Sequence, residues 1–407
     1  MTLWRALVAT VTGALRDRGR VVMFVAAVPV YSFFYPLPYA TQAVRHVPLV
    51  VVDLDASPMS RDIVSRLSAV PSVRIDGSAS TVGEASGALA SGRIAGIVLV
   101  PENFSRDAAR GTPTAVTVFG TGAYPVQDKA VLGSVGAVLQ DVIGEVGGAR
   151  MARQGAPAAA LLQSARAGPA FVDQPLYNLA RGYGSYVVVA VGILIVQQVM
   201  LMAIASLVGT WLEARDGTLF GAQRVGMSAL LGTLFGFSLF VLLALLYFIG
   251  FVFWFQDYPR GGNFAGALAF AALTALTVAS LGIALGAWFA DRERAFQVLL
   301  ATSVPFLFMC GIVFPREAMP APVNALAWLI PTTPGIFGFV KLNQMGATWS
   351  EIRPEFINMA ALLLLYATLA AWAVHRRRQG AAQGGPAPCA AASPSQRCCW
   401  RAARRGP

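Results

Sequence analysis

Two stretches near the end of the apolar part of the chain, Gly311–Pro320 (GIVFPREAMP) and Trp328–Thr333 (WLIPTT), indicate most about the fold. Both place prolines and small residues where a membrane helix should continue or leave the bilayer. Unpaired backbone groups cannot face lipid, so a broken helix at membrane depth persists only inside protein or along a cavity. The stretches therefore predict a re-entrant element at the mouth of a pathway. A tight external turn without a role is the alternative.

The composition around these stretches is that of an integral membrane protein. Charged residues make up 13% of the 407 residues, against about 25% in soluble domains, and the mean hydropathy is +0.61. Six apolar runs approach the roughly 20 residues that cross a bilayer. We expect a membrane all-α fold of six transmembrane helices with an inserted extracytoplasmic α/β domain. The predicted spans are 21–37, 186–211, 228–255, 264–289, 296–314 and 356–374.

The inserted domain is predicted over 44–182, ahead of a five-helix part at 183–375. Short apolar runs that favour strands alternate with helical segments, which predicts a small sheet covered by helices. The last helical segment, 127–153, carries valines at helical spacing. Residues 154–176, rich in Ala, Gly and Pro, are typical of a linker. The strand runs are 47–54, 73–75, 94–100 and 115–119, and the valines are Val131, Val135, Val138, Val142 and Val146.

Residues 1–20 precede the first span. Leu3, Leu7, Val11 and Leu15 recur at helical spacing among arginines, which predicts an amphipathic helix at the cytoplasmic surface of the membrane. A basic flank before an apolar run also fits a cleaved signal peptide. The run is long, however, and ends in the aromatic cluster 31–35, which favours a retained span with its aromatic residues at the outer interface.

The distribution of arginine predicts how the chain is oriented. The formal net charge of +11 could suggest nucleic acid, but the arginines gather at span ends and in the tail rather than on one soluble face. We therefore expect a lipid membrane and no nucleic acid as partner. Basic residues beside short loops place both termini in the cytoplasm and residues 44–182 outside. The basic tail, 376–407, is predicted to be disordered.

The sequence lacks the residues that several classes of protein need for their function. Neither lysine, Lys129 or Lys341, belongs to a phosphate-binding loop, so an ATPase would have to be another polypeptide. The two histidines, His46 and His375, fall on opposite predicted sides of the membrane, so a histidine metal or triad site is poorly supported. The predicted spans also lack the buried acids of proton relays, which argues against ion-driven antiport. We expect no catalytic residue, metal or cofactor in this chain.

A few residues within and between the spans are candidates for function. Gln197 and Gln198 lie in mid-span, where an amide lines a pathway or, in the alternative, makes an interhelical hydrogen bond. Residues 211–220 (WLEARDGTLF) are either a docking segment, with aromatics and Leu219 to insert into a partner, or a plain charged turn. Two glycine pairs predict close packing of helices: Gly232 with Gly236, and Gly282 with Gly286.

Four motifs together resemble the ABC-2 type permeases of bacterial exporters, in the branch with a large periplasmic domain after the first span and HlyD-like adaptors. The order of one span, a large domain and five spans is also similar, and the resemblance covers residues 1 to about 378. The motifs are Pro48–Arg61 (PLVVVDLDASPMSR), Ala90–Phe104 (ASGRIAGIVLVPENF), Glu213–Thr218 (ExRDGT), and Gly311–Pro320 with Pro331-Thr332-Thr333.

The resemblance implies roles for several segments. Residues 2–20 would be a connecting helix against the ATPase, 212–226 the coupling helix, and 315–342 re-entrant outer helices that gate release. In place of the charges that often follow Thr218 in the family, this chain has Leu219-Phe220-Gly221-Ala222. The implied ATPase-coupling residues are Glu213, Arg215, Gly217 and Thr218, and the implied outer-gate residues are Gly311, Phe314, Pro315, Met319, Pro320, Pro331 and Thr332.

The resemblance also implies partners. Separate ATPase subunits would bind ATP, and a second permease copy or paralogue would face this chain in the bacterial inner membrane. The outer domain could meet a periplasmic HlyD-like adaptor. The implied function is export of a hydrophobic or amphipathic substrate, since the spans offer few ionisable groups for a charged one. Two other classes stay open: a membrane-anchored receptor or assembly scaffold that acts through the outer domain, and a secondary transporter.

Overall fold

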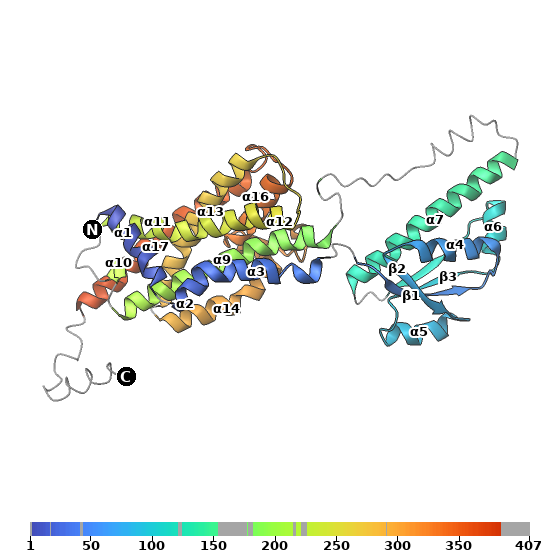
Figure 1. The fold of residues 1–407 in the computed structure, drawn as a ribbon, viewed down its shortest axis with the longest axis horizontal. Helices are drawn as coiled ribbons and strands as arrows, with labels where there is room; N and C mark the ends of the chain where they lie inside the picture. Colours follow the sequence, from blue (N-terminus) through green and yellow to red (C-terminus); the bar gives the residue numbers. More distant parts are fainter. Residues whose placement is uncertain are drawn as a thin grey trace. The chain divides into compact units, whose positions relative to one another are not determined.

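The structure is a computed structural model that describes residues 2–16, 18–40, 44–120, 124–153, 177, 182–214, 217–220, 226–289 and 291–383. The chain divides into two compact units, each described here by itself. The membrane unit comprises Met1–Ala40 and Gly184–Pro407, and the α/β unit comprises Thr41–Tyr183. Figure 1 shows the elements of both units. The predicted linker at 154–176 lies outside the described residues.

The α/β unit contains a four-stranded sheet in the order β2-β1-β3-β4. β1 pairs in parallel with β2 and β3, and β4 closes the other edge antiparallel to β3. Alternate residues of the central strand β1 enter different cores, Leu49 and Val51 on one face and Val50 and Val52 on the other. This two-sided burial explains its continuous apolar sequence. The strands are β1 (Val47–Asp53), β2 (Val73–Ser78), β3 (Gly96–Val100) and β4 (Thr117–Gly120).

Helices cover both faces of this sheet. α5 (Val82–Ala90) packs on one face through Ala85. α4 (Pro58–Ala69), α6 (Phe104–Arg110) and α7 (Pro125–Arg153) contribute to the core on the other face. Ser57 and Ser60 form a capping box that starts α4. The predicted valine stripe of α7 is confirmed: Val131, Val135, Val138 and Val142 are buried, and Val146 packs against them.

The membrane unit is helical. Its first part comprises α1 (Leu3–Leu15), α2 (Arg18–Val21), the π-helix η1 (Val22–Ala26), α3 (Ala27–Phe34) and η2 (Leu37–Tyr39). Its second part begins with α9 (Tyr183–Glu213), α10 (Gly217–Phe220), α11 (Met227–Leu246), η3 (Tyr247–Val252), α12 (Phe253–Phe255) and α13 (Phe264–Phe289). It continues with α14 (Arg292–Met309), η4 (Arg316–Ala318), α15 (Ala321–Ala327), α16 (Thr332–Phe339), η5 (Val340–Gln344) and α17 (Arg353–Gln383).

Among the described residues, six helical segments are long and apolar enough to cross a membrane. Five of them correspond to predicted spans. The sixth, Val126–Arg153, is α7, whose valines pack on the sheet, so it is a covering helix of the α/β unit. The other five segments are Arg18–Tyr39, Tyr183–Glu213, Met227–Phe255, Phe264–Phe289 and Arg353–Gln379.

Two predicted boundaries are wrong. The span expected over 296–314 ends early, because α14 stops at Met309 and Gly311 turns the chain with a φ of +85°. The apolar part of α14, 295–309, is about 22 Å long at 1.5 Å per residue, which is short of the roughly 30 Å of a bilayer core. The disordered tail expected from 376 is also wrong at its start: α17 continues to Gln383. Arg377 Nε donates to the Ala287 carbonyl at the end of α13 (3.0 Å), which anchors this last stretch.

The two glycine pairs are packing faces, as predicted. An added Cβ at Gly236 would lie 2.9 Å from Thr10 Cβ of α1, and one at Gly286 would lie 2.7 Å from Val208 Cβ of α9. α1 therefore docks on α11 through small residues, its buried Ala6, Thr10 and Ala14. Leu3 and Leu15 of the predicted amphipathic stripe stay exposed.

Candidate functional site

The predicted break in the last apolar part of the chain is confirmed. α15 (Ala321–Ala327) and the helix Thr332–Gln344 are bent by 79° relative to each other, as in a broken span or a re-entrant loop. Pro320 is the N-cap residue of α15 and Pro331 that of α16, where a missing N–H costs nothing because the first donors of a helix are unpaired anyway. Thr332 and Thr333, directly after the bend, are buried. We call residues 315–344 the broken hairpin.

Arg316 ties the parts of the broken hairpin together. Its guanidinium carbon lies 4.2 Å from the Trp328 ring centroid and 5.2 Å from that of Phe337, and its Nη2 donates to Asn324 Oδ1 (2.9 Å). These contacts join η4, α15, the bend and α16 through one side chain, by hydrogen bonding and cation–π attraction. Since φ is positive at Gly311 and its missing Cβ leaves room for Arg316, a side chain there would disturb both.

The remaining implied gate residues, Phe314, Pro315 and Met319, lie in the segment at the start of the hairpin. Phe314 and Val313 are exposed, Pro315 precedes η4, and Met319 ends it. The Tyr186 hydroxyl of α9 donates to the Ile312 carbonyl (2.7 Å), and the Tyr366 hydroxyl of α17 donates to the Leu329 carbonyl. The chain just before the hairpin and the bend within it are thus hydrogen-bonded to neighbouring long helices.

A buried ion pair at the hairpin escaped the sequence analysis. Lys341 Nζ lies 2.8 Å from Glu355 Oε1, and the Glu355 side chain is only 7% exposed. The predicted span 356–374 contains no acidic residue, but α17 starts three residues before that span and carries the buried Glu355 in its first turn. The scarcity of lysine, with one of the two lysines beside apolar helices, was the signal that could have indicated the pair.

Gln198 satisfies the alternative prediction for the mid-span amides. Its Nε2 donates to Ser303 Oγ (3.0 Å) and to the Leu299 carbonyl (3.3 Å), both on α14. Gln197 is also buried, but its Nε2 has no hydrogen-bond partner among the described residues. Gln198 therefore forms an interhelical hydrogen bond to α14. Gln197 keeps a buried amide nitrogen that no described residue binds, so it remains the candidate for lining a pathway.

The register of α9 against α16 brings Gln197 to the level of the bend. Gln344 Nε2 donates to the Ser185 carbonyl, and a Cβ added at Gly335 would lie 3.7 Å from Ile193 Cγ2. The two chain directions are opposite along this pair, so Thr332 falls about one turn beyond Ile193, near the level of Gln197. The hydroxyls of Thr332 and Thr333 also lack partners among the described residues. Buried groups of this kind are costly unless something binds them.

Glu213, an implied coupling residue, contacts the start of α14. Its Oε1 accepts a hydrogen bond from the backbone N–H of Arg292 (2.8 Å), while Asp291 Oδ1 accepts from that of Glu293 (2.8 Å). Two carboxylates thus satisfy the free donors and the positive end of one helix. Arg215 lies outside the described residues. Gly217 and Thr218 begin the short helix α10.

The residues expected to insert into a partner are used within this chain instead. Leu219 is fully buried, and its carbonyl accepts from Arg378 Nη1 of α17 (3.0 Å). Trp211 is buried and stacks on Phe237 of α11, with ring centroids 5.7 Å apart. Of the two alternatives for this segment, the one in which Leu219 and an aromatic residue insert into a partner does not hold for Leu219 and Trp211, because the membrane unit already covers them.

Comparison with known proteins agrees with this architecture. The sequence model of a family described as "ABC-2 family transporter protein" matches residues 19–372, which is most of the chain. No curated protein matches the chain. The family comprises membrane components of ABC transporters, which fits the long apolar helices found above. The chain therefore belongs to the ABC-2 family of transporters.

Proposed function

We propose that this chain is the permease subunit of an ATP-driven exporter. It moves a hydrophobic or amphipathic substrate outward, and a separate ATPase subunit binds and hydrolyses ATP. The observation that carries the proposal is the broken hairpin, whose bend buries the hydroxyls of Thr332 and Thr333 without hydrogen-bond partners in the described part of the chain, near the level of Gln197. Broken helices at membrane depth persist where they line a cavity or lie within protein, and such groups suit the polar end of a passing substrate.

The ATPase contact in this proposal lies at the segment around Glu213, with α1 beside it. Family membership supports an ABC ATPase as partner. The segment is short and directly joined to three long helices: α9 leads into it, Glu213 contacts α14, and Arg378 of α17 holds Leu219. Arg215, Gly217 and Thr218 complete the proposed coupling residues. A push on this segment therefore acts on the ends of α14 and α17 together.

α14 is the proposed link between the coupling segment and the gate. It is 18 residues long, or about 27 Å, and runs from the Glu213 contact to the turn at Gly311 that leads into the broken hairpin. Gln198 fastens its middle to α9 through Ser303. Tilting α14 about this bond would move Pro315 and Arg316, and with them the hairpin. The proposed gate residues are Gly311, Phe314, Pro315, Met319, Pro320, Pro331 and Thr332.

The proposed assembly follows the family. A second copy of the chain, or a paralogue, faces this one in the bacterial inner membrane, with both termini in the cytoplasm. The α/β unit then lies in the periplasm, where a HlyD-like adaptor is the proposed further partner. The chain itself binds no cofactor in this scheme, because ATP is bound by the partner. In this scheme the α/β unit is on the periplasmic side of the membrane, which is also the side on which an exported substrate is released.

Purification and transport assays test the proposal. We expect a tagged chain to co-purify with an ATP-binding subunit, and inside-out vesicles holding both to accumulate an amphipathic fluorescent dye when ATP is supplied. If an uncoupler abolishes the export of the dye and loss of the ATPase does not change it, the chain is a secondary transporter. A chain that recruits no ATPase and moves no dye would favour a receptor or scaffold.

Glu213→Ala tests the coupling step. The variant loses a charge-assisted bond to the start of α14, an interaction of about 1–2 kcal/mol, so we expect ATP-driven transport to fall about tenfold while ATP hydrolysis by the complex continues. Glu293→Ala removes another carboxylate from the first turn of α14, one for which the described part of the chain shows no hydrogen bond from another element, and this variant should transport normally. Equal transport by the two variants would argue against Glu213 as the coupling residue.

A further inference from the structure

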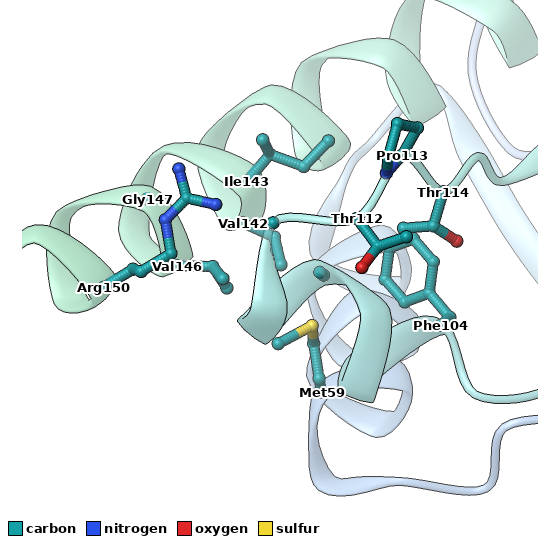
Figure 2. A pocket seen from close by; sticks show the side chains of 12 residues that line it. Met59, Phe104, Thr112, Pro113, Thr114, Val142, Ile143, Val146, Gly147 and Arg150 are labelled. Carbon is teal, nitrogen blue, oxygen red and sulfur yellow. The ribbon is translucent and has the colours of Figure 1, made fainter.

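The α/β unit contains a cavity that the transport proposal does not use. It lies between α4, the end of α6 with the loop that follows, and the second half of α7, and its volume is about 250 Å³. Figure 2 shows its lining, with Arg150 at one end and Thr112 and Thr114 at the other. Most of the wall is apolar: Met59, Phe104, Val142 and Val146.

The cavity exists because small residues stand where larger ones would fill it. Ala108, Gly111 and Gly147 line it. A Cβ added at Gly147 would meet no atom within 4 Å, so the space beside it is open. Gly111 ends α6 with a φ of +79°, and the Arg150 guanidinium occupies the place where its Cβ would be. The glycine thus holds the arginine against the wall of the cavity.

Arg150 brings an uncompensated positive charge to this apolar space. It forms no hydrogen bond or ion pair with any residue that the structure describes. Arg66 of α4 offers the contrast: its guanidinium makes a two-pronged bond to Glu145 of α7, at 2.8 and 2.7 Å. A guanidinium is weakly hydrated and carries a planar fork of donors that matches carboxylate and phosphate groups. Arg150 is therefore placed to bind an anion.

We propose that this cavity binds a small amphipathic anion, with its apolar body between Met59, Phe104 and Val146 and its acidic group on Arg150. At about 30 Å³ for each water-sized group, the cavity holds roughly eight such groups, which sets the ligand near an eight-carbon chain. A fatty acid and a short lipid phosphate share this chemistry. The proposal is independent of the transport proposal, because binding is measured without ATP or movement of substrate.

Photolabelling of the full chain in lipid nanodiscs tests the site. The probes are octanoate, octyl phosphate and octanol, each with a diazirine at the end of the chain, and labelled peptides are mapped by mass spectrometry. We expect an acidic probe to label peptides that contain Phe104 or Val142, in competition with unmodified octanoate, and the neutral probe to label them at least tenfold less. The acid that labels more strongly identifies the source, a carboxylate or a phosphate. Equal labelling by the neutral probe would overturn the proposal.

Two pairs of variants separate binding from general effects. Arg150→Gln should lower acidic labelling about tenfold, the loss expected for one charged bond, whereas Arg153→Gln, one turn further along α7, should not. Gly147→Leu should fill the cavity and abolish labelling. Gly148→Leu is its matched control, because a Cβ there also meets nothing within 4 Å, but Gly148 is not part of the lining. Labelling that survives Gly147→Leu in a folded protein, or that both controls also lose, would refute the site.

Discussion

Glu355 is a buried carboxylate at the end of a long apolar helix, and its pairing with Lys341 makes that burial tolerable. The Lys341 side chain is 34% exposed, against 7% for Glu355. We expect Glu355→Leu to destabilise the membrane unit by about 3 kcal/mol, the lower end for a broken buried pair, because Lys341 can turn toward solvent. The double variant Lys341→Met/Glu355→Leu should recover most of that loss, since an apolar pair of similar size costs little.

Denaturant unfolding followed by tryptophan fluorescence measures these two variants and the single variant Lys341→Met, and the resulting double-mutant cycle isolates the pair. Additive losses from the two single variants, with no recovery in the double variant, would mean that the ion pair contributes nothing of its own. The same cycle would show whether the pair fixes the hairpin, since η5 carries Lys341 and α17 carries Glu355.

The Arg66–Glu145 bond gives the α/β unit a dependence on pH. The hydrogen bond from Arg66 holds the pKa of Glu145 below its usual value. A depressed pKa in the folded state stabilises the fold above the unfolded pKa, about 4.3, and this contribution is lost as the pH falls through the lower, folded value. We expect Glu145→Gln to lower the melting temperature at pH 7, and the difference from the wild type to vanish in acid. A constant difference at all pH values would exclude the carboxylate as its source.

At the scale of elements, α1 depends on the missing side chains of α11. A Cβ at Gly232 would lie 2.6 Å from Ala6 Cβ, so Gly232→Leu should displace α1, at a cost of about 1–3 kcal/mol for overpacking. Gly250→Leu is the control, because a Cβ there meets nothing within 4 Å on the same span. Hydrogen exchange measures the outcome: residues 3–15 should exchange faster in the first variant only. Unchanged exchange in Gly232→Leu would contradict the docking.

The elements were predictable where one local signal decides them. Each of the four strands falls on a predicted apolar run, and the valine period of α7 gave its buried face. Predicted ends of helices were wrong where contacts with distant parts of the chain decide how far the helix continues. The end of α14 at Met309 did have a local signal, Gly311 directly after the C-cap Cys310, but the apolar run continues past it to Phe314 and hides it. α17 continues past 376 because Arg377 reaches carbonyls of α13. The leucine period of α1 predicted an amphipathic helix but not its docking on α11, because close approach to the glycines selects the small residues beside the leucines.

The candidate site shows the same division. Proline and glycine spacing predicted the break at 311–333, because those residues act on their own backbone. The pairing of Lys341 with Glu355 and of Gln198 with Ser303 joins residues 14 and 105 positions apart. The rarity of lysine singles out Lys341, but its partner and that of Gln198 are decided by how the helices pack. The burial of Leu219, likewise, follows from the helices around it.

At the scale of the whole molecule, the proposed orientation makes a clear prediction for protease access. We expect proteases added to intact spheroplasts to cut within the α/β unit, and proteases added to sealed inside-out vesicles to spare it. The positive-inside distribution of arginine is the physical reason. An epitope tag at the carboxyl end should behave in the opposite way and serves as the control. Cleavage of the α/β unit in inside-out vesicles would reverse the topology and the direction of the proposed transport.

The docking of α1 on α11 also affects biosynthesis. The ribosome completes Leu3–Leu15 first, yet the glycines that receive this helix belong to Met227–Leu246. More than two hundred residues, the entire α/β unit among them, must be made in between. At about 5–20 residues per second, the nascent helix waits roughly ten to forty seconds for its partner. Its exposed Trp4 and Leu15 give it a means of waiting on the lipid headgroups until the receiving surface emerges.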